Sequence, residues 1–396
     1  MSATARRSLL ALLVPLFALV VWLQVQMDPM RKRYQPGKVT NIEIGTQFVA
    51  ATLIGLKEVV AGLLWVRADE FFHSGNYAAV IPIVRIVTWL DPHQIDVYDT
   101  GAWHLSYNFT DSQERSDRRY IPPAQALYRE GIANNPDIYD LYFAQGWMNF
   151  HKVLDFKKAI EAFTEANKRP AVDPSTGKKR MRPQFVGHTL AHAYRKDGQI
   201  DRAIEQWRQN IKDNERYVRE SRDPGEQVMV DVARNNLNQL LREKEERSRL
   251  KPVKNVHFDA QWQFLGPRKF RVFGTLDLPT GARVRLVLRD KNFKEQQFQK
   301  FSWDIDTNQT ILIDDLYVKD GRFSRTIDIE RDVSIYPLKA EEYVMTFTFN
   351  PLTAPDFVQD VVGFKGEGLA DQKYLVVRNG VRMLEKSFII KRNQLL

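Results

Sequence analysis

The chain has 396 residues and contains no cysteine. Without cysteine, a protein has no disulfide scaffold, no thiolate catalyst and no zinc or iron–sulfur site with cysteine ligands. A Gly-x-Ser-x-Gly elbow, a dinucleotide-binding fingerprint and the spacing of a hydrolase triad are also missing. We therefore predict that the protein is not an enzyme and that it uses no cofactor and no metal.

Hydrophobic residues make up 43% and charged residues 27% of the chain, which is ordinary for a globular protein of two or three domains. The formal net charge is +9, but residues 41–140 hold 13 acidic and 7 basic residues. A nucleic-acid-binding protein needs its basic residues on one coherent face, and this acidic stretch argues against one. A basic segment of another protein would suit it, so we predict protein partners, no nucleic acid and no small-molecule substrate.

Residues 8–27 form an apolar run without a charge, about as long as a bilayer crossing requires. The alternative is a removable signal peptide. The small residues of a cleavage site are missing, however, and Trp22, Leu23 and Met27 stand there instead. We expect an uncleaved, single-pass transmembrane helix that anchors the chain in the cytoplasmic membrane.

The charges that flank this run do not decide its orientation, because basic residues stand on both sides of it. A short amino-terminal tail before a body of about 370 residues is the layout of bacterial signal-anchored proteins. We expect residues 1–40 to form a cytoplasmic tail, the anchor and a basic juxtamembrane segment, with the body in the cell envelope outside the cytoplasm. Arg31, Lys32 and Arg33 are predicted to contact the membrane surface.

A second apolar stretch, residues 48–66, contains Lys57 and Glu58 near its middle. Burying such a pair at the depth of a bilayer costs several kcal/mol. We interpret this stretch as a soluble or interfacial helix that leads into the helical part of the chain. A helical hairpin inside the membrane is the alternative.

Two parts of the chain repeat each other at a spacing of 44 residues. An aromatic residue, a small residue and a tryptophan recur, since Tyr98, Ala102 and Trp103 correspond to Tyr142, Gly146 and Trp147. The stretches that follow share a small residue, an aromatic residue, a small residue and a proline, since Ala124, Tyr128, Gly131 and Pro136 correspond to Ala159, Phe163, Ala166 and Pro170. This pattern predicts packed helical hairpins, in which small residues let two helices approach and aromatic residues fill the space between hairpins.

Two further copies carry the same kinds of residue, namely Leu190, Ala191, Tyr194, Gly198, Ala203 and Trp207, and earlier Ala68, Phe71, Gly75, Tyr77 and Pro92. With these residues the chain resembles the tetratricopeptide repeat (TPR) family. The resemblance covers about 160 residues in four repeats, 61–94, 95–138, 139–171 and 184–217, with about ten extra residues around 111–120. It implies an α-solenoid of about four hairpins within residues 41–250, capped by a polar helix over 227–249.

From Val256 onward the hydrophobic period changes from that of helices to two, as in Val284, Leu286 and Leu288. Turn signals such as Gly266-Pro267 and Asn350-Pro351 follow at short intervals. Residues 251–396 are therefore predicted to form an antiparallel β-sandwich, which resembles immunoglobulin-like modules in its pattern. The expected fold is multidomain α + β.

The TPR resemblance implies that the first helix of each hairpin lines a groove that binds partners. It places nine residues there: Trp65, Asp69, Asp99, Trp103, Phe143, Trp147, His188, His192 and Arg195. The alternative is that the tryptophans fill gaps between irregular repeats or contact the β-sandwich. His188 and His192, four residues apart, would suit a metal, but Thr189 follows where a metalloprotease helix has glutamate, and no third ligand is apparent.

The sequence thus predicts a non-catalytic, membrane-anchored scaffold that binds proteins through a TPR-like groove during assembly of a membrane or envelope complex. One alternative is a fixed accessory subunit of a larger membrane complex, whose groove is filled by a neighbour. Another is an envelope enzyme or glycan-binding protein that uses the loops of the β-sandwich.

Overall fold

The computed structural model describes residue 22 and residues 57–396, except 75, 116, 174–176, 250, 252–254, 299 and 302–304. The predicted anchor over 8–27, apart from Trp22, and the juxtamembrane Arg31, Lys32 and Arg33 lie outside these residues. Within the described part of the chain, no helix is both long and apolar enough to cross a membrane. The chain divides into two compact units, residues 1–98 and 99–396, and each is described by itself.

The first unit contains a helical hairpin, α3 (Lys57–His73) and α4 (Tyr77–Leu90), which corresponds to the first predicted repeat. Helix α3 buries Ala61 and Ala68. Val59, Leu63 and Val66 on the same helix are 55%, 68% and 69% exposed. Residues 57–66 of the second apolar stretch therefore form the start of a helix that leaves much of its apolar surface uncovered.

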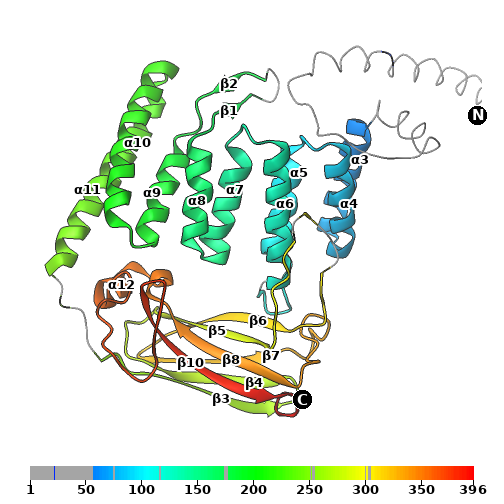
Figure 1. Cartoon of the computed structure of the whole chain (residues 1–396), viewed down its shortest axis with the longest axis vertical. Helices are drawn as coiled ribbons and strands as arrows, with labels where there is room; N and C mark the ends of the chain where they lie inside the picture. Colours follow the sequence, from blue (N-terminus) through cyan, green and yellow to red (C-terminus); the bar gives the residue numbers. More distant parts are fainter. Residues whose placement is uncertain are drawn as a thin grey trace, which may run out of the picture. The chain divides into compact units, whose positions relative to one another are not determined.

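The second unit begins with helices that pair along the chain. They are α5 (Ile95–Trp103, which starts before the boundary), α6 (Ile121–Asn134), α7 (Asp140–Met148), α8 (Phe156–Asn167), α9 (Phe185–Lys196), α10 (Ile200–Ser221) and α11 (Gln227–Arg249). Consecutive helices from α7 to α11 pack against each other (Figure 1). The helical hairpins predicted from the repeats are confirmed, and α11 covers α10 at their end, as predicted for a capping helix.

Small and aromatic residues make the close contacts that the repeat pattern predicted. At Gly146 of α7, an added Cβ would lie 2.6 Å from the ring of Phe163 on α8, so only glycine fits there. Gly198, between α9 and α10, has φ of 72°, a backbone conformation that side chains other than glycine rarely adopt. Asp155 caps α8 by accepting a hydrogen bond from the backbone nitrogen of Lys158 at 3.1 Å.

Two features of the helical half were not predicted. A short hairpin, β1 (Ala171–Val172) and β2 (Lys179–Arg180), occupies the stretch between the third and fourth repeats. A π-helix also follows each of two first helices, at His104–Asn108 after α5 and at Asn149–Val153 after α7. A π-helix widens the helical turn by one residue and changes the direction of the side chains that follow.

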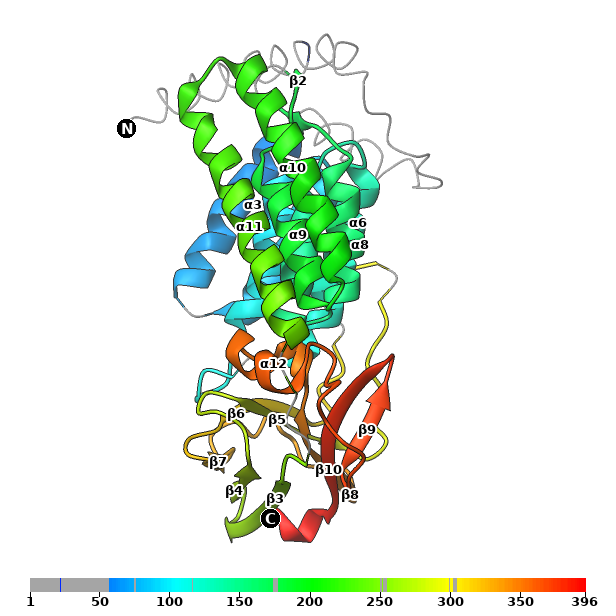
Figure 2. The ribbon, with the colours of Figure 1, turned by 90° about the vertical axis from the view of Figure 1, so that its left-hand side faces the viewer.

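The carboxy-terminal half consists of antiparallel strands, as predicted. They are β3 (Phe258–Gly266), β4 (Lys269–Leu276), β5 (Arg283–Asp290), β6 (Ile311–Tyr317), β7 (Arg322–Asp328), β8 (Glu342–Phe349), β9 (Leu375–Arg378) and β10 (Val381–Lys391), with a short helix α12 (Asp356–Val362). One sheet has the order β3-β4-β7 and the other β6-β5-β8-β10-β9. Alternate residues of the strands, such as Leu286 on β5 and its register partner Phe347 on β8, are fully buried in one apolar core to which both sheets contribute. Figure 2 shows the strands of the two sheets as ribbons.

The extra residues of the second repeat bind the β-strand half. Asp111 is buried and accepts hydrogen bonds from Arg115 Nε and from Tyr336 Oη, both at 2.7 Å. Ser112 Oγ donates to Asp332 Oδ2 at 2.7 Å. Because a buried ion pair needs partners for its remaining polar atoms, this network holds the insertion against the strands in one arrangement.

Candidate functional site

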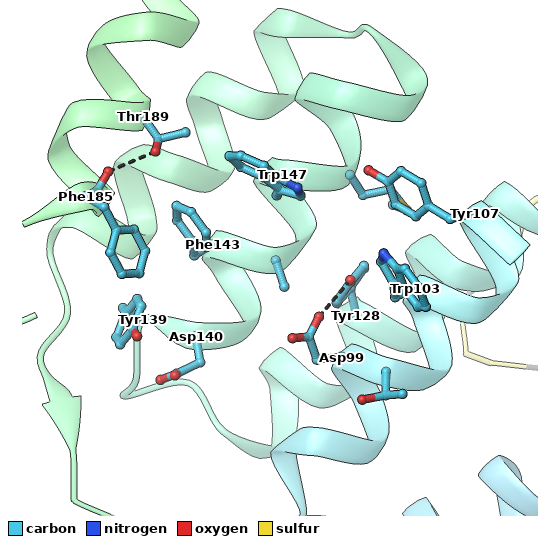
Figure 3. A pocket seen from close by; sticks show the side chains of 13 residues that line it. Asp99, Trp103, Tyr107, Tyr128, Tyr139, Asp140, Phe143, Trp147, Phe185 and Thr189 are labelled. Carbon is cyan, nitrogen blue, oxygen red and sulfur yellow. Dashed lines mark hydrogen bonds between the residues drawn. The ribbon is translucent and has the colours of Figure 1, made fainter. Parts of the chain in front are cut away.

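A cavity of about 670 Å³ lies along the first helices of the second, third and fourth repeats (Figure 3). Its walls are mostly aromatic, with a few polar side chains: Asp99, Thr100, Trp103, Tyr107, Tyr128, Tyr139, Asp140, Phe143, Ala144, Trp147, Met148, Phe185 and Thr189. We call this cavity the aromatic groove. Large apolar side chains that stay exposed together on a folded surface indicate a place where another molecule binds.

The two tryptophans of the aromatic groove occupy equivalent positions in successive repeats. Trp103 is 45% and Trp147 is 41% exposed. The Trp103 ring stacks on Tyr107, with centroids 6.0 Å apart, and the Trp147 ring packs against His151 at 4.0 Å. Both partners stand four residues after their tryptophan, inside the π-helices, so these turns place an aromatic pair at the same point of each repeat.

The rest of the aromatic wall comes from α7 and α9. The Phe143 ring stacks on Trp147 at 5.9 Å and meets the edge of Phe185 at 5.0 Å. Phe185 in turn contacts Tyr139 at 6.4 Å and is 41% exposed. These contacts hold the rings in fixed directions, so a ligand would meet a preformed apolar surface.

Carboxylates stand beside these rings. The Tyr128 hydroxyl donates a hydrogen bond to Asp99 Oδ1 at 3.1 Å. Burial, together with the neighbouring Asp99 carboxylate, holds the pKa of Tyr128 well above its usual range. Burial and the adjacent Asp140 raise the pKa of Tyr139 to about 12. Both phenols therefore stay protonated near neutral pH and remain hydrogen-bond donors to the carboxylates.

A second cavity of about 410 Å³ shares Trp147, Phe185 and Thr189 with the aromatic groove. Its other lining residues come from the π-helix after α7 and from α9: Phe150, His151, His188, His192, Arg195 and Lys196. The Arg195 guanidinium is already bound, since its Nη2 lies 2.8 Å from Glu243 and 3.0 Å from Asp356. The second cavity has no carboxylate among its lining residues, whereas the aromatic groove has Asp99 and Asp140. The positive charge of Arg195 is nevertheless balanced by its two ion pairs.

His188 belongs to the packing beneath this second cavity. It is 6% exposed, its ring meets the edge of Trp207 at 5.0 Å, and its Nε2 accepts a hydrogen bond from Asn214 Nδ2 at 2.8 Å. An amide nitrogen can only donate, so this contact requires a neutral imidazole. Burial, with a smaller contribution from His192, lowers the pKa of His188 to about 4.

The structure brings seven of the nine predicted groove residues to these two cavities. Asp99, Trp103, Phe143 and Trp147 line the aromatic groove, and His188, His192 and Arg195 line the second cavity with Trp147. Trp65 is half-buried and Asp69 is exposed on α3, in the first unit. In the described part of the chain, no group of three or more histidine, aspartate and glutamate side chains is placed to hold a metal ion.

Sequence reasoning missed Tyr107, Tyr139, Asp140 and Phe185 as groove residues. The one available signal for Tyr107 was its position four residues after Trp103, which matches that of His151 after Trp147. Phe185 starts α9, and its place in the groove depends on how the fourth repeat packs on the third. Nothing in the local pattern distinguished it from a core residue.

Comparison with known proteins finds no matching family model and no matching curated protein. Among solved structures, a crystal structure of MamA protein is 16% identical over 50% of this chain and 98% of its own, with a TM-score of 0.29. A second MamA crystal structure is 16% identical over 46% and 97%, with a TM-score of 0.27. A crystal structure of PilW, a type IV pilus biogenesis factor, is 13% identical over 48% and 82%, with a TM-score of 0.28. Likeness at this level transfers no function, so the geometry of the described residues has to supply it.

Proposed function

We propose that this protein is a non-catalytic scaffold that binds a peptide segment of a partner protein in the aromatic groove. The observation that carries the proposal is the pair of half-exposed tryptophans, Trp103 and Trp147, which equivalent turns of two repeats present to one cavity. Tryptophan anchors of this kind supply much of the binding free energy in protein interfaces.

The lining of the groove indicates the chemistry of the bound segment. Aromatic faces take apolar side chains, and they also attract the cation of lysine or arginine. Asp99 and Asp140 stand beside the rings and would complement such a cation. The acidic excess of residues 41–140 would add to the rate of encounter with a basic segment more than to its affinity. The proposed ligand is therefore a peptide with a basic residue next to apolar ones.

The proposed place of work is the cytoplasmic membrane, with the body on its outer side, during assembly of a membrane or envelope complex. This part of the proposal is supported by the sequence alone: the apolar run over 8–27 and the basic Arg31, Lys32 and Arg33 after it. Accessibility of engineered cysteines in intact cells tests it, because the chain has no cysteine of its own. If cysteines engineered into the body reacted with a membrane-impermeant thiol reagent only after the cells were lysed, the outward orientation would be contradicted.

A fixed accessory subunit is the second candidate, and the first helical hairpin favours it. Val59, Leu63 and Val66 expose three apolar side chains along one helix, α3. A permanently bound neighbour would cover such a surface. A fixed subunit copurifies with a constant set of proteins in whole-number ratios, whereas a transient scaffold does not.

We also propose that the β-strand half is an immunoglobulin-like module. The strand order supports it, because the first, second and fifth strands (β3, β4 and β7) form one sheet, and the third and sixth (β5 and β8) pair in the other, as in that fold. The fourth strand, β6, extends the second sheet instead of the first. A crystal structure of the full-length protein would test the assignment through the order of these strands.

The main experiment purifies the full-length protein in mild detergent, identifies what copurifies by mass spectrometry, and measures binding of the partner's basic and apolar segments. The double variant Trp103→Ala, Trp147→Ala should lose binding while circular dichroism stays unchanged. The matched control is Phe264→Ala on β3, since Phe264 is 45% exposed and does not line the groove.

Unchanged affinity in a folded double variant would reject the groove as the binding surface. Loss of binding in Phe264→Ala or in Tyr317→Ala, another exposed aromatic residue of the β-strand half, would instead favour a site on the β-sandwich. Glycans should then be tested as ligands in place of peptides.

A further inference from the structure

A third cavity, of about 340 Å³, shares no residue with the aromatic groove. It lies where the start of α6 meets β5, β6 and the loop between these strands. Four cationic side chains, Arg118, Arg119, Arg289 and Lys294, and two carboxylates, Glu295 and Asp306, are among its lining residues. Four minus two leaves a surplus of two positive charges in the lining, or one when Asp117 behind Arg119 is counted.

Arg119 is one of the lining residues, and one of its guanidinium nitrogens has no hydrogen-bond partner. Its side chain is 7% exposed. Nε and Nη2 bind the Asp117 carboxylate at 3.0 and 2.6 Å, but Nη1 is buried without a hydrogen-bond partner. A buried polar atom left in this state costs free energy, so native structures usually supply a partner.

The other cations of the cavity stand near carboxylates, Glu295 and Asp306 in the lining and Asp315 beside Arg118, without forming a close ion pair with them. Arg118 donates from Nη1 to the backbone oxygen of Lys152 at 3.0 Å, and neither it nor Arg289 nor Lys294 forms an ion pair within the described residues. Burial, followed by the nearby Arg285, lowers the pKa of Arg118 to about 10, although the Asp315 and Glu295 carboxylates oppose this shift. Burial and Arg118 lower the pKa of Lys152 to about 8. The neighbourhood therefore holds more positive charge than it neutralises.

The start of α6 adds to this charge and restricts how an anion would be held. Ile121 and Pro122 line the cavity at the first turn of a 14-residue helix, whose amino-terminal end carries partial positive charge. Pro122 and Pro123 have no backbone N–H, so this turn offers fewer amide donors than a phosphate-binding loop does. The arginine side chains would have to supply the hydrogen bonds.

We propose that this cavity binds an oxyanion, a phosphate or carboxylate group carried by a small ligand. Guanidinium groups match both kinds of oxyanion with paired hydrogen bonds. A volume of about 340 Å³ exceeds that of a single ion, so the oxyanion belongs to a larger molecule. In this proposal the oxyanion accepts hydrogen bonds from Arg118 and from Arg289 and Lys294 on the strand side, and the Arg119 guanidinium adds positive charge to the lining.

The test measures binding of inorganic phosphate and, separately, of acetate to the full-length protein in mild detergent by isothermal titration calorimetry at constant ionic strength. Phosphate should bind in a one-to-one ratio. The double variant Arg289→Gln, Lys294→Gln, whose residues are exposed, should weaken binding by about tenfold or more, as should Arg118→Gln. Arg271→Gln with Lys319→Gln removes the same charge from exposed positions outside the cavity and should leave binding unchanged.

The outcomes separate the sources of the oxyanion and decide the proposal. Tighter binding of phosphate assigns the site to phosphate groups, and tighter binding of acetate assigns it to carboxylates. Absence of saturable binding of either ion, or equal affinity in the cavity variants and the control, would overturn the proposal and leave a water-filled crevice. The test is independent of the groove, because Trp103→Ala with Trp147→Ala should bind the ion normally.

Discussion

The second and third repeats share a first helix and diverge directly after it. In both, a tryptophan lies in the last two residues of the helix, a π-helix follows at His104–Asn108 or Asn149–Val153, and both tryptophans line the aromatic groove. The third repeat then turns at once, through Leu154 with φ of 62° and the cap residue Asp155, into α8. The second repeat instead inserts the segment that binds the β-strand half.

This difference assigns the groove and the contact with the strands to different parts of a repeat. What the repeats have in common builds the groove, and what the second repeat adds fixes the helical half to the strands. A loop between packed helices accepts an insertion without disturbing their contact. The insertion therefore contacts the strands while Trp103 and Trp147 still line one groove.

The largest expected effect comes from breaking the insertion at Asp111. Its side chain is fully buried and pairs with Arg115, whose side chain is 4% exposed. Asp111→Ala leaves that buried guanidinium with only the more distant Asp314 carboxylate, 3.8 Å away, and should lower the free energy of unfolding by about 3 kcal/mol. Denaturant unfolding of the full chain, followed by circular dichroism, measures the loss.

Asp137→Ala is the control for this prediction, because Asp137 is an exposed aspartate in the loop after α6. Its free energy of unfolding should stay within about 0.5 kcal/mol of the parent. If Asp111→Ala changed the free energy of unfolding as little as this control does, the insertion would be an ordinary surface loop. The second repeat would then not stabilise the contact with the strands, contrary to the comparison with the third.

The shared part of the repeats predicts that Trp103 and Trp147 contribute alike to binding. Each single alanine variant should weaken binding of the partner segment by about 2 kcal/mol, or roughly thirtyfold, because each removes one anchor of the same surface. Calorimetric titration of both variants against one peptide checks this. A loss confined to one variant would show that only one repeat serves the groove.

Much of this comparison was open to sequence reasoning. The helical hairpins followed from the spacing of small and aromatic residues, because those contacts are local, as between Gly146 and Phe163. The antiparallel strands followed from alternation, because every second residue of β5 and β8 faces one core. Trp103, Phe143 and Trp147 were expected in the groove, and they do line one cavity.

What stayed hidden depends on contacts between distant residues. The hydrogen bonds of the insertion to Asp332 and Tyr336 join residues that are 220 and 225 positions apart in the sequence, so no local pattern predicts them. The two π-helices were missed as well, because no local pattern in the sequence marked them. For the same reason, the cationic cavity beside α6 was invisible, because its residues come from both halves of the chain.

The fourth repeat extends the comparison to a buried histidine and predicts a dependence on pH. His188 has a pKa of about 4 when folded, and an ordinary value near 6.5 when unfolded. Between these values the unfolded chain binds more protons, so stability falls as the pH drops from 7 through 6.5 towards 4. The contribution of His188 to this loss should be about 2 kcal/mol between pH 7 and pH 5.

His188→Gln removes the proton-binding group and should flatten the loss of stability on acidification by that amount. His257→Gln replaces an exposed histidine and serves as the control, with the pH dependence of the parent. Parallel unfolding curves for the parent and His188→Gln at both pH values would contradict the neutral, hydrogen-bonded His188 in the fourth repeat.

The smallest expected effect tests the direct turn of the third repeat. Asp155 accepts from the backbone nitrogen of Lys158 at the start of α8, so Asp155→Ala should cost about 1 kcal/mol of unfolding free energy. Peptide binding should stay unchanged, because Asp155 does not line the groove. Asp155→Asn keeps a capping oxygen and should restore most of the loss. A drop in peptide affinity without a drop in stability would mean that this turn, too, positions Trp147, and that the two tasks are less separate than the repeats suggest.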